Sequence, residues 1–203
     1  MEKNEKYIPA LNFGWLTPLY DPLIRWSMPA AKFKTRLVKQ ARLQGGHRVL
    51  DLGCGTATLT ILIKQIHPDA EVIGLDGDSR ILEIARKKAA KVSAEITLHQ
   101  AMAFQLPYAE NSFDRVLSSL VLHHLTVDNK RRTLAEVRRV LEPQGELHVA
   151  DFRRPNKSLP AMFRETGFER VEEYAEYRTV FGTVSLWRAR GASARSKVHP
   201  GGV

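Results

Sequence analysis

VLDLGCGTATL, at residues 49–59, joins an apolar run to an Asp, two glycines one residue apart and the start of a helical pattern. Glycine has no Cβ, so the backbone at Gly53 and Gly55 can approach a ligand closely. The helix that follows adds unpaired N–H groups and partial positive charge, which suit an anionic group. The segment therefore predicts a strand, a tight glycine turn and a helix that together form a ligand site.

A second acid supports this reading. VIGLD, at residues 72–76, ends in Asp76, about 20 residues after the turn, where nucleotide-binding βαβ units place the carboxylate that binds ribose hydroxyls. A dinucleotide site favours a third glycine, and Thr56-Ala57-Thr58 follow Gly55 instead. Two acids at the ends of neighbouring parallel strands are costly to bury without a role. We therefore predict that Asp51 and Asp76 bind a cofactor, with helix capping or solvation as the alternative.

The composition bounds the class of protein. The chain has 203 residues, 43% of them hydrophobic, and a single Cys, which excludes an intrachain disulfide and a Cys-based metal cluster. The polar N-terminus is not followed by a signal-peptide pattern or a membrane span, so we expect a cytoplasmic protein with no required metal. The net charge is +9, concentrated at residues 25–42, at residues 130–139 and after Arg188, which can attract nucleic acid or anionic lipid.

Strand and helix patterns alternate along the chain. Predicted strands cover residues 48–53, 71–76, 96–101, 113–119, 146–151, 169–179 and 183–190, and predicted helices cover 30–44, 56–66, 79–91, 130–141 and 159–166. This alternation predicts an α/β fold with a doubly wound parallel sheet, and the short Phe181-Gly182 connection predicts an antiparallel edge hairpin. We divide the chain into an N-terminal cap segment with a basic amphipathic helix (1–44), a ligand-binding domain (45–190) and a disordered basic tail (191–203).

Further motifs carry a family resemblance. LPY at 106–108, NSFDRV at 111–116, LVLHHL at 120–125 and LAEVRRVLEPQGEL at 134–147 follow one another in order. Over about residues 47–190 the chain resembles the ubiquinone/menaquinone group (methyltransferase type 11) of class I S-adenosylmethionine (SAM) methyltransferases. The resemblance implies a Rossmann-like, seven-stranded sheet in the order 3-2-1-4-5-7-6 with strand seven antiparallel. It also implies SAM as cofactor and S-adenosylhomocysteine (SAH) as product.

The resemblance assigns cofactor residues by position. Asp76 binds the ribose hydroxyls, and Gly77 stands where a large apolar residue often meets the adenine. Met102 and Ala103 replace part of a Gly-Asp-Ala sequence, so backbone groups read the adenine edge there. Family members often carry a third glycine at Ala57. The remaining residues assigned to the cofactor lie in the turn and at the end of the fourth strand: Asp51, Gly53, Cys54, Gly55, Thr56, Ser118 and Ser119.

Two histidines and an acid are candidate catalytic residues. His123 and His124 follow the fourth strand, and Asp151 follows the fifth. A neutral imidazole can take a proton from a hydroxyl nucleophile near pH 7, and in some small-molecule O-methyltransferases of this group a His here works with such an acid. Because adjacent side chains point apart, we expect at most one base and favour His123. The alternative is that the doublet packs and Asp151 is a cap.

Other candidate residues have two interpretations each. Cys54 could be a reactive thiol at a helix N-terminus or a small residue in a crowded turn, and we favour the latter. Trp15 and Tyr20, in WLTPLYD at 15–21, resemble an N-terminal lid over the SAM pocket, with packing on the sheet as the alternative. Helix 30–44 could lie on an anionic membrane at its inner face, or pack on the sheet with a solvated outer side, which we favour.

The absence of certain sequence motifs narrows the classes of methyl acceptor. The fourth strand ends in Ser118-Ser119-Leu120-Val121 rather than Asn/Asp-Pro-Pro-Tyr/Phe, which argues against amino-methylating DNA and RNA enzymes. A sole Cys in the turn argues against thiolate-based nucleobase methylation and against arsenite methylation. We predict a small or lipid-like acceptor, with a phospholipid amine and a quinone as candidates. The rival functions are a nucleic-acid-associated protein using its basic surface and a non-catalytic SAM-fold binding module.

Overall fold

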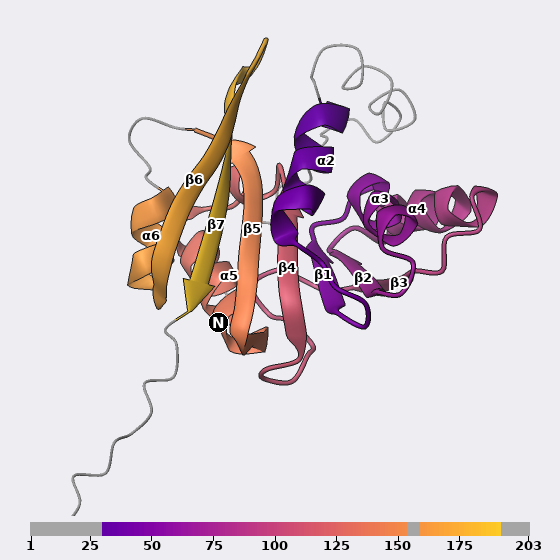
Figure 1. Ribbon diagram of the computed structural model, residues 1–203, viewed down its shortest axis with the longest axis horizontal. Helices are drawn as coiled ribbons and strands as arrows, with labels where there is room; N and C mark the ends of the chain where they lie inside the picture. The colour runs from indigo at the N-terminus through magenta and orange to yellow at the C-terminus, as the bar shows by residue number, and fades with distance from the viewer. Residues whose placement is uncertain (1–29, 154–158, 192–203) are drawn as a thin grey trace, which may run out of the picture.

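Seven strands form one sheet in the order β3-β2-β1-β4-β5-β7-β6 in the computed structural model (Figure 1). The first five strands pair in parallel, and β7 pairs antiparallel with both β5 and β6. The predicted order and the antiparallel seventh strand are therefore confirmed. The strands are β1 (Arg48–Leu52), β2 (Glu71–Asp76), β3 (Thr97–Gln100), β4 (Phe113–Ser119), β5 (Leu141–Phe152), β6 (Phe168–Thr179) and β7 (Gly182–Gly191).

The structure describes residues 30–153 and 159–191. The proposed lid residues Trp15 and Tyr20, and the predicted tail after Gly191, lie outside these ranges. Within them, no helix is long and apolar enough to cross a membrane.

Helices cover both faces of the sheet (Figure 1). One core cluster joins Val49, Val72 and Leu117 of the strands to α2 and α3, and the opposite cluster joins Leu50 and Val116 to α5 and α6. Because both faces are buried, the central strands are apolar on both sides. The helices are α2 (Ala30–Ala41), α3 (Thr58–Ile66), α4 (Ser79–Lys91), the 3₁₀ helix η2 (Leu122–His124), α5 (Val127–Val140) and α6 (Leu159–Glu165).

Some element boundaries differ from the prediction. Helix α5 begins at Val127 rather than at 130, because the Thr126 hydroxyl accepts a hydrogen bond from the Asn129 N–H at 3.2 Å and caps the helix. Strand β5 begins at Leu141 rather than at 146, since Leu141 pairs with Phe113 before the register shifts. Helix 30–44 ends at Ala41, and the 3₁₀ helix η2 was not predicted.

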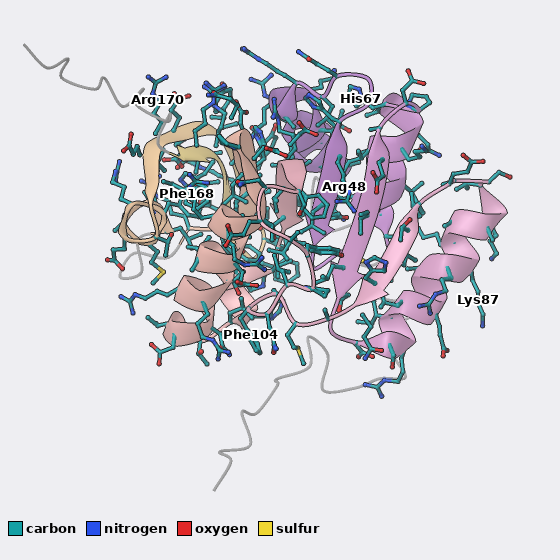
Figure 2. The ribbon with its side chains drawn as sticks, turned by 90° about the horizontal axis from the view of Figure 1, so that it is seen from below. Arg48, His67, Lys87, Phe104, Phe168 and Arg170 are labelled. Atoms are coloured by element: carbon teal, nitrogen blue, oxygen red, sulfur yellow. The ribbon has the colours of Figure 1, made fainter. Side chains whose placement is uncertain are left out.

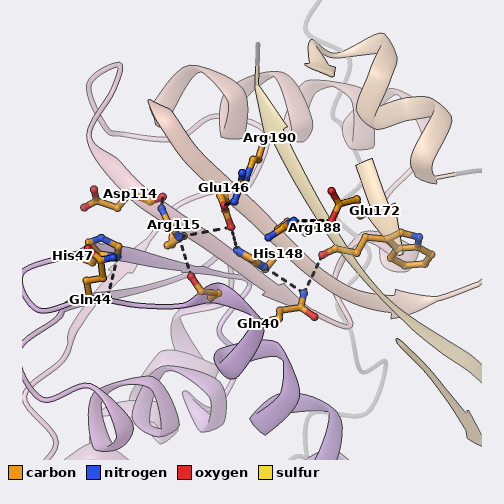
Figure 3. A network of polar contacts seen from close by, with 12 residues as sticks. Gln40, Gln44, His47, Asp114, Arg115, Glu146, His148, Glu172, Arg188 and Arg190 are labelled. Carbon is orange, nitrogen blue, oxygen red and sulfur yellow. Dashed lines mark hydrogen bonds and ion pairs between the residues drawn. The ribbon is translucent and has the colours of Figure 1, made fainter. Parts of the chain in front are cut away.

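A buried polar network fixes α2 on the sheet (Figure 3). Glu146 of β5 lies between Arg115 of β4 and Arg190 of β7, and it pairs with both. His148, two residues along, has Nε2 3.0 Å from Glu146 Oε2 and Nδ1 3.3 Å from Gln40 Nε2 of α2.

The same network sets the direction of α2. Arg115 Nε donates to the carbonyl of Ala41, the last residue of α2, at 3.0 Å. Because Arg115 stands near the start of β4, the C-terminus of α2 lies at the edge where the parallel strands begin. The N-terminus of α2 therefore points to the edge where these strands end.

Burial acts on both ionisable groups of this network. Burial lowers the pKa of His148, which favours the neutral ring with Nε2–H donating to Glu146 and Nδ1 accepting from Gln40. Burial alone would raise the pKa of Glu146, but the His148 hydrogen bond and the charges of Arg115 and Arg190 outweigh it and lower the pKa to about 2. At the centre of the network, one carboxylate therefore forms ion pairs with two guanidinium groups.

Glu146→Gln is expected to destabilise the fold by about 3 kcal/mol, because it leaves two partly buried guanidinium groups without their counter-charge. The matched change is Glu165→Gln, which removes an exposed pair with Arg131 and is expected to cost less than about 1 kcal/mol. Urea unfolding at pH 7 measures both. Equal costs for the two variants would contradict the role given to Glu146.

The wild-type protein is also expected to lose stability as the pH falls. The folded pKa values of His148 and Glu146 are both below their ordinary values, so the unfolded chain takes up more protons in acid. Their contribution is present at pH 7, declines below pH 6.5 through His148, and declines further below pH 4.5 through Glu146.

Candidate active site

The turn between β1 and α3 adopts the left-handed conformation three times. Gly53, Gly55 and Ala57 have φ values of 72°, 54° and 59°. A Cβ on Gly53 would lie 2.5 Å from Val121 Cγ2, so only glycine lets the segment after β4 lie against the turn. A Cβ on Gly55 would meet no atom of residues 30–153 or 159–191 within 4 Å, so this part of the turn is open with respect to the described fold. The positive φ of Ala57 is a conformation that glycine adopts more easily, which is a physical reason for the third glycine that the family resemblance implies there.

Asp76 is held directly beside this turn. Its Oδ2 accepts a hydrogen bond from the Gly55 N–H at 2.9 Å, and its Oδ1 accepts one from the Asp78 N–H at 3.0 Å. Burial raises the pKa of Asp76, and these backbone donors oppose the rise. The Gly77 N–H also acts on this carboxylate, so at least one of the roughly four acceptor positions on its two oxygens is left. The structure thus brings Asp76 and the glycine turn together, with capacity left for hydroxyl donors.

Asp51 lies buried beneath the turn. Its Oδ2 accepts a hydrogen bond from Thr60 Oγ1 at 2.6 Å. Burial raises the pKa of Asp51 to about 6; Thr60 and the charge of Lys34 on α2 oppose the rise, and the charge of Asp76 adds to it. Thr60 was not predicted as a site residue. The sequence feature that could have indicated it is a hydroxyl side chain on the apolar side of a short helix.

Lys88 of α4 also supports the turn. Its Nζ donates to Thr58 Oγ1 at 2.6 Å and to Thr56 Oγ1 at 3.5 Å, across the start of α3. The neighbouring Lys87 points away from α3 into solvent (Figure 2). The sequence pattern does not separate the two lysines, because both lie in a basic stretch of one helix.

Cys54 and Ser118 support the turn from below. Cys54 Sγ lies 3.0 Å from the place where Gly74 of β2 would carry a Cβ, so the thiol packs on the neighbouring strand. Burial raises the pKa of Cys54, which keeps it a thiol and fits the interpretation as a small residue in a crowded turn. Ser118 donates to the Leu52 carbonyl at 3.1 Å. Within the described ranges, the buried hydroxyl of Ser119 has no hydrogen-bond partner.

Gly77, Met102 and Ala103 lie at the same edge of the sheet. The Ala101 N–H donates to the Asp76 carbonyl at 3.1 Å, which joins the ends of β2 and β3. The Gly77 carbonyl accepts from Gln100 Nε2 at 3.4 Å, and the Met102 carbonyl accepts from the Gln105 N–H at 3.0 Å. We call the edge where the parallel strands end, which carries the glycine turn at 53–57 and Asp76, the ligand edge. These turns extend it from Asp76 towards β3.

His123 and Asp151 form a dyad at the ends of β4 and β5. His123 Nδ1 lies 2.7 Å from Asp151 Oδ1, and the His123 N–H donates to Asp151 Oδ2 at 3.2 Å. The buried Asp151 also accepts from the Phe152 N–H at 2.7 Å, and the Phe152 ring meets His123 edge-on at 5.0 Å. The His124 ring lies against that of His123 with centroids 3.9 Å apart and an angle of 40° between the ring planes. The predicted acid therefore contacts His123.

This arrangement can remove a proton. A carboxylate can only accept, so Nδ1–H of His123 donates to Asp151 and Nε2 is left as the proton acceptor of a neutral ring. Val121, which lies against Gly53, is two residues from His123, so the same short segment joins the dyad to the glycine turn. Across the described residues, no three His, Cys, Asp or Glu side chains converge as a metal site.

Comparisons with known proteins give the family. A family model described as a methyltransferase domain matches residues 49–145. The demethylmenaquinone methyltransferase of Symbiobacterium thermophilum is 32% identical over 204 residues, which covers 98% of this chain and 76% of the relative. That of Lactobacillus johnsonii is 33% identical over 147 residues, and the match covers 71% of this chain and 59% of the relative's length.

A solved structure shows the same fold. The SAM-dependent methyltransferase from Aquifex aeolicus matches with a TM-score of 0.68 at 16% identity, over 91% of this chain and 99% of its own. At this identity the likeness concerns the fold alone.

Asp51→Asn is expected to stabilise the free protein at pH 8, because it removes a buried charge and keeps the hydrogen bond from Thr60. The folded pKa is raised above 3.8, so the stability linked to Asp51 is present below that pH and is lost as the pH rises through about 6. The gain should reach up to about 3 kcal/mol at pH 8 and vanish near pH 4. Urea unfolding at both pH values tests this, with the exposed Asp69→Asn as control; equal stability of Asp51→Asn and wild type at pH 8 would contradict it.

Proposed function

Because the chain belongs to the class I SAM-dependent methyltransferases, in the group that resembles menaquinone methyltransferases, we propose that it methylates a small, lipid-soluble acceptor of the quinone class. The relatives are demethylmenaquinone methyltransferases, which favours a quinone over a phospholipid amine. The observation that carries the proposal is the Asp76 carboxylate, held by the Gly55 N–H at the ligand edge.

The residues at this edge fit the cofactor. Asp76 would accept hydrogen bonds from the ribose hydroxyls at its remaining acceptor positions, and the open space before Gly55 would receive the methionine end. Asp51 and Asp76 place negative charge beside a cofactor that carries an ammonium and a sulfonium group. SAM supplies an activated methyl group when bound. Gly77 and the backbone N–H groups of Met102 and Ala103 would border the adenine.

His123 would act as the general base. With Nδ1–H held by Asp151, Nε2 would take the proton from a hydroxyl of the reduced acceptor, a quinol, and the electron pair of the broken O–H bond would raise the electron density of the attacking atom. Asp151 would hold the ring in this tautomer and stabilise the imidazolium that forms. A dyad of this kind favours an enzyme over a non-catalytic binding module.

Helix α2 contributes a basic outer surface. Phe33 and Leu37 are buried against the sheet, which supports the alternative in which this helix packs on the fold. Lys32, Arg36 and Lys39 are exposed on its outer side. We propose that these cations attract the protein to an anionic membrane, since the apolar side of α2 is already used by the core.

The cofactor site is tested by calorimetric titration with SAH. We expect micromolar binding by the wild-type protein and at least about tenfold weaker binding by Asp76→Ala, because hydrogen bonds to a charged carboxylate are lost. Asp69→Ala, an exposed acid at the opposite end of β2, is the matched control and should bind like wild type. Failure of the wild-type protein to bind SAH would overturn the proposal.

The dyad is tested by turnover of a short-chain, reduced demethylmenaquinone analogue. His123→Asn and Asp151→Asn are expected to slow methyl transfer by about 10²- to 10⁴-fold while SAH affinity is kept. His124→Asn is the matched control, because its ring contacts that of His123 and the hydrogen bond to Asp151 comes from His123. A larger loss in His124→Asn than in His123→Asn would contradict the assignment.

A further inference from the structure

Two large apolar side chains are exposed at the tip of the β6–β7 hairpin. Val180 is 76% exposed and Phe181 is 60% exposed, against 48% for Val92 and 41% for Ile66, the other exposed large apolar residues of the described chain. The tip has its own hydrogen bonds: Thr179 Oγ1 accepts from the Phe181 N–H at 3.1 Å and donates to the Gly182 carbonyl at 2.7 Å. The apolar pair is therefore presented outward by an ordered turn.

This tip lies at the ligand edge of the sheet. Val184 of β7 pairs with Phe152 of β5, next to Asp151 of the dyad, and the Arg153 N–H donates to the Thr183 carbonyl at 2.8 Å. Val180 and Phe181 lie farther along the hairpin, towards its tip, than these paired residues. The hairpin extends past the end of β5 (Figure 1). The exposed pair thus projects beyond the edge that carries His123 and Asp151.

Exposed cations lie on the elements that lead up to the tip. The first turn of α2 lies beside the hairpin, since the Phe33 and Tyr177 ring centroids are 6.2 Å apart, and Lys32 is exposed next to Phe33. Arg178 is exposed on β6, two residues before Val180.

The acids nearest the tip are already paired. Glu173 and Glu176 both form ion pairs with Arg153. Arg153 offsets only one of these two carboxylates, so with Lys32 and Arg178 the five charged side chains named around the hairpin carry three positive and two negative charges, a net charge of +1.

We propose that the β6–β7 tip inserts Val180 and Phe181 into the surface of an anionic bilayer and so holds the ligand edge against the membrane. Peripheral binding needs buried apolar surface together with attraction between cations and anionic headgroups, and a convex apolar tip beside exposed cations offers both. This inference rests on the proposed function, because a lipid-soluble acceptor would reach the dyad from that membrane. It assigns the apolar contact to the hairpin and the electrostatic attraction to α2 and Arg178.

The test is sedimentation of the full chain with vesicles of phosphatidylglycerol and phosphatidylcholine, and with phosphatidylcholine alone. The Val180→Ser/Phe181→Ser double variant is expected to bind the anionic vesicles at least about tenfold more weakly than wild type. The Ile66→Ser/Val92→Ser double variant, which removes the other exposed pair, should bind within about twofold of wild type. Wild-type binding should weaken on neutral vesicles and at high salt.

Activity separates this inference from the proposed function. The hairpin variant should keep SAH affinity and the rate with a water-soluble short-chain acceptor, and should lose rate only with a long-chain acceptor embedded in vesicles. Absence of wild-type transfer to any quinol would overturn the proposed function and leave vesicle binding by the tip standing. Equal vesicle binding by the hairpin variant and wild type would overturn the inference. A second result would also overturn it: a wild-type protein that is a dimer and does not bind vesicles, together with a hairpin variant that is a monomer. The tip would then be a contact between two copies of the chain.

Discussion

The ligand edge depends on the close approach of Val121 to Gly53. A side chain at Gly53 would collide with Val121. The glycine therefore lets the segment after β4 lie directly against the turn after β1. Leu120 takes a left-handed φ of 61° at this crossing and donates its N–H to the Ala150 carbonyl at 2.8 Å. The chain then enters η2 with His123 aimed at Asp151. A glycine in one motif thereby fixes the position of a histidine in another.

The edge concentrates acids that the fold alone would not select. Asp51 and Asp76 both have pKa values raised by burial; hydrogen-bond donors oppose the rise at both acids, and the charge of Lys34 opposes it at Asp51. Buried charge of this kind costs stability, and natural sites accept such a cost where a ligand needs it. A cationic cofactor would add positive charge beside both acids. Cofactor binding is therefore expected to reduce the free-energy cost of keeping these buried carboxylates ionised.

The sequence was sufficient for the strand order and for the positions of the glycine turn and of the acids at the candidate site, because each depends on local pattern or on a motif. Asp76, His123 and Asp151 lie where the prediction places them, at the ends of β2, β4 and β5. Thr60 and Lys88 were missed, because their roles depend on which side of a helix meets the turn. The early start of β5 was missed because its pairing with Phe113 outweighs a Pro and a Gly that favour a loop.

The division of the surface between α2 and the hairpin follows from the same packing. The apolar side of an amphipathic helix cannot pack on the core and contact lipid at the same time. In α2, Phe33 and Leu37 are buried in the core. The Glu146–His148 network beneath α2 holds that choice in place, since lifting the helix would expose Gln40 and break the Arg115 contact with the Ala41 carbonyl. Any apolar contact with lipid must therefore come from another element. The hairpin next to α2, with its exposed pair past the end of β5, is the element that the sheet topology places there.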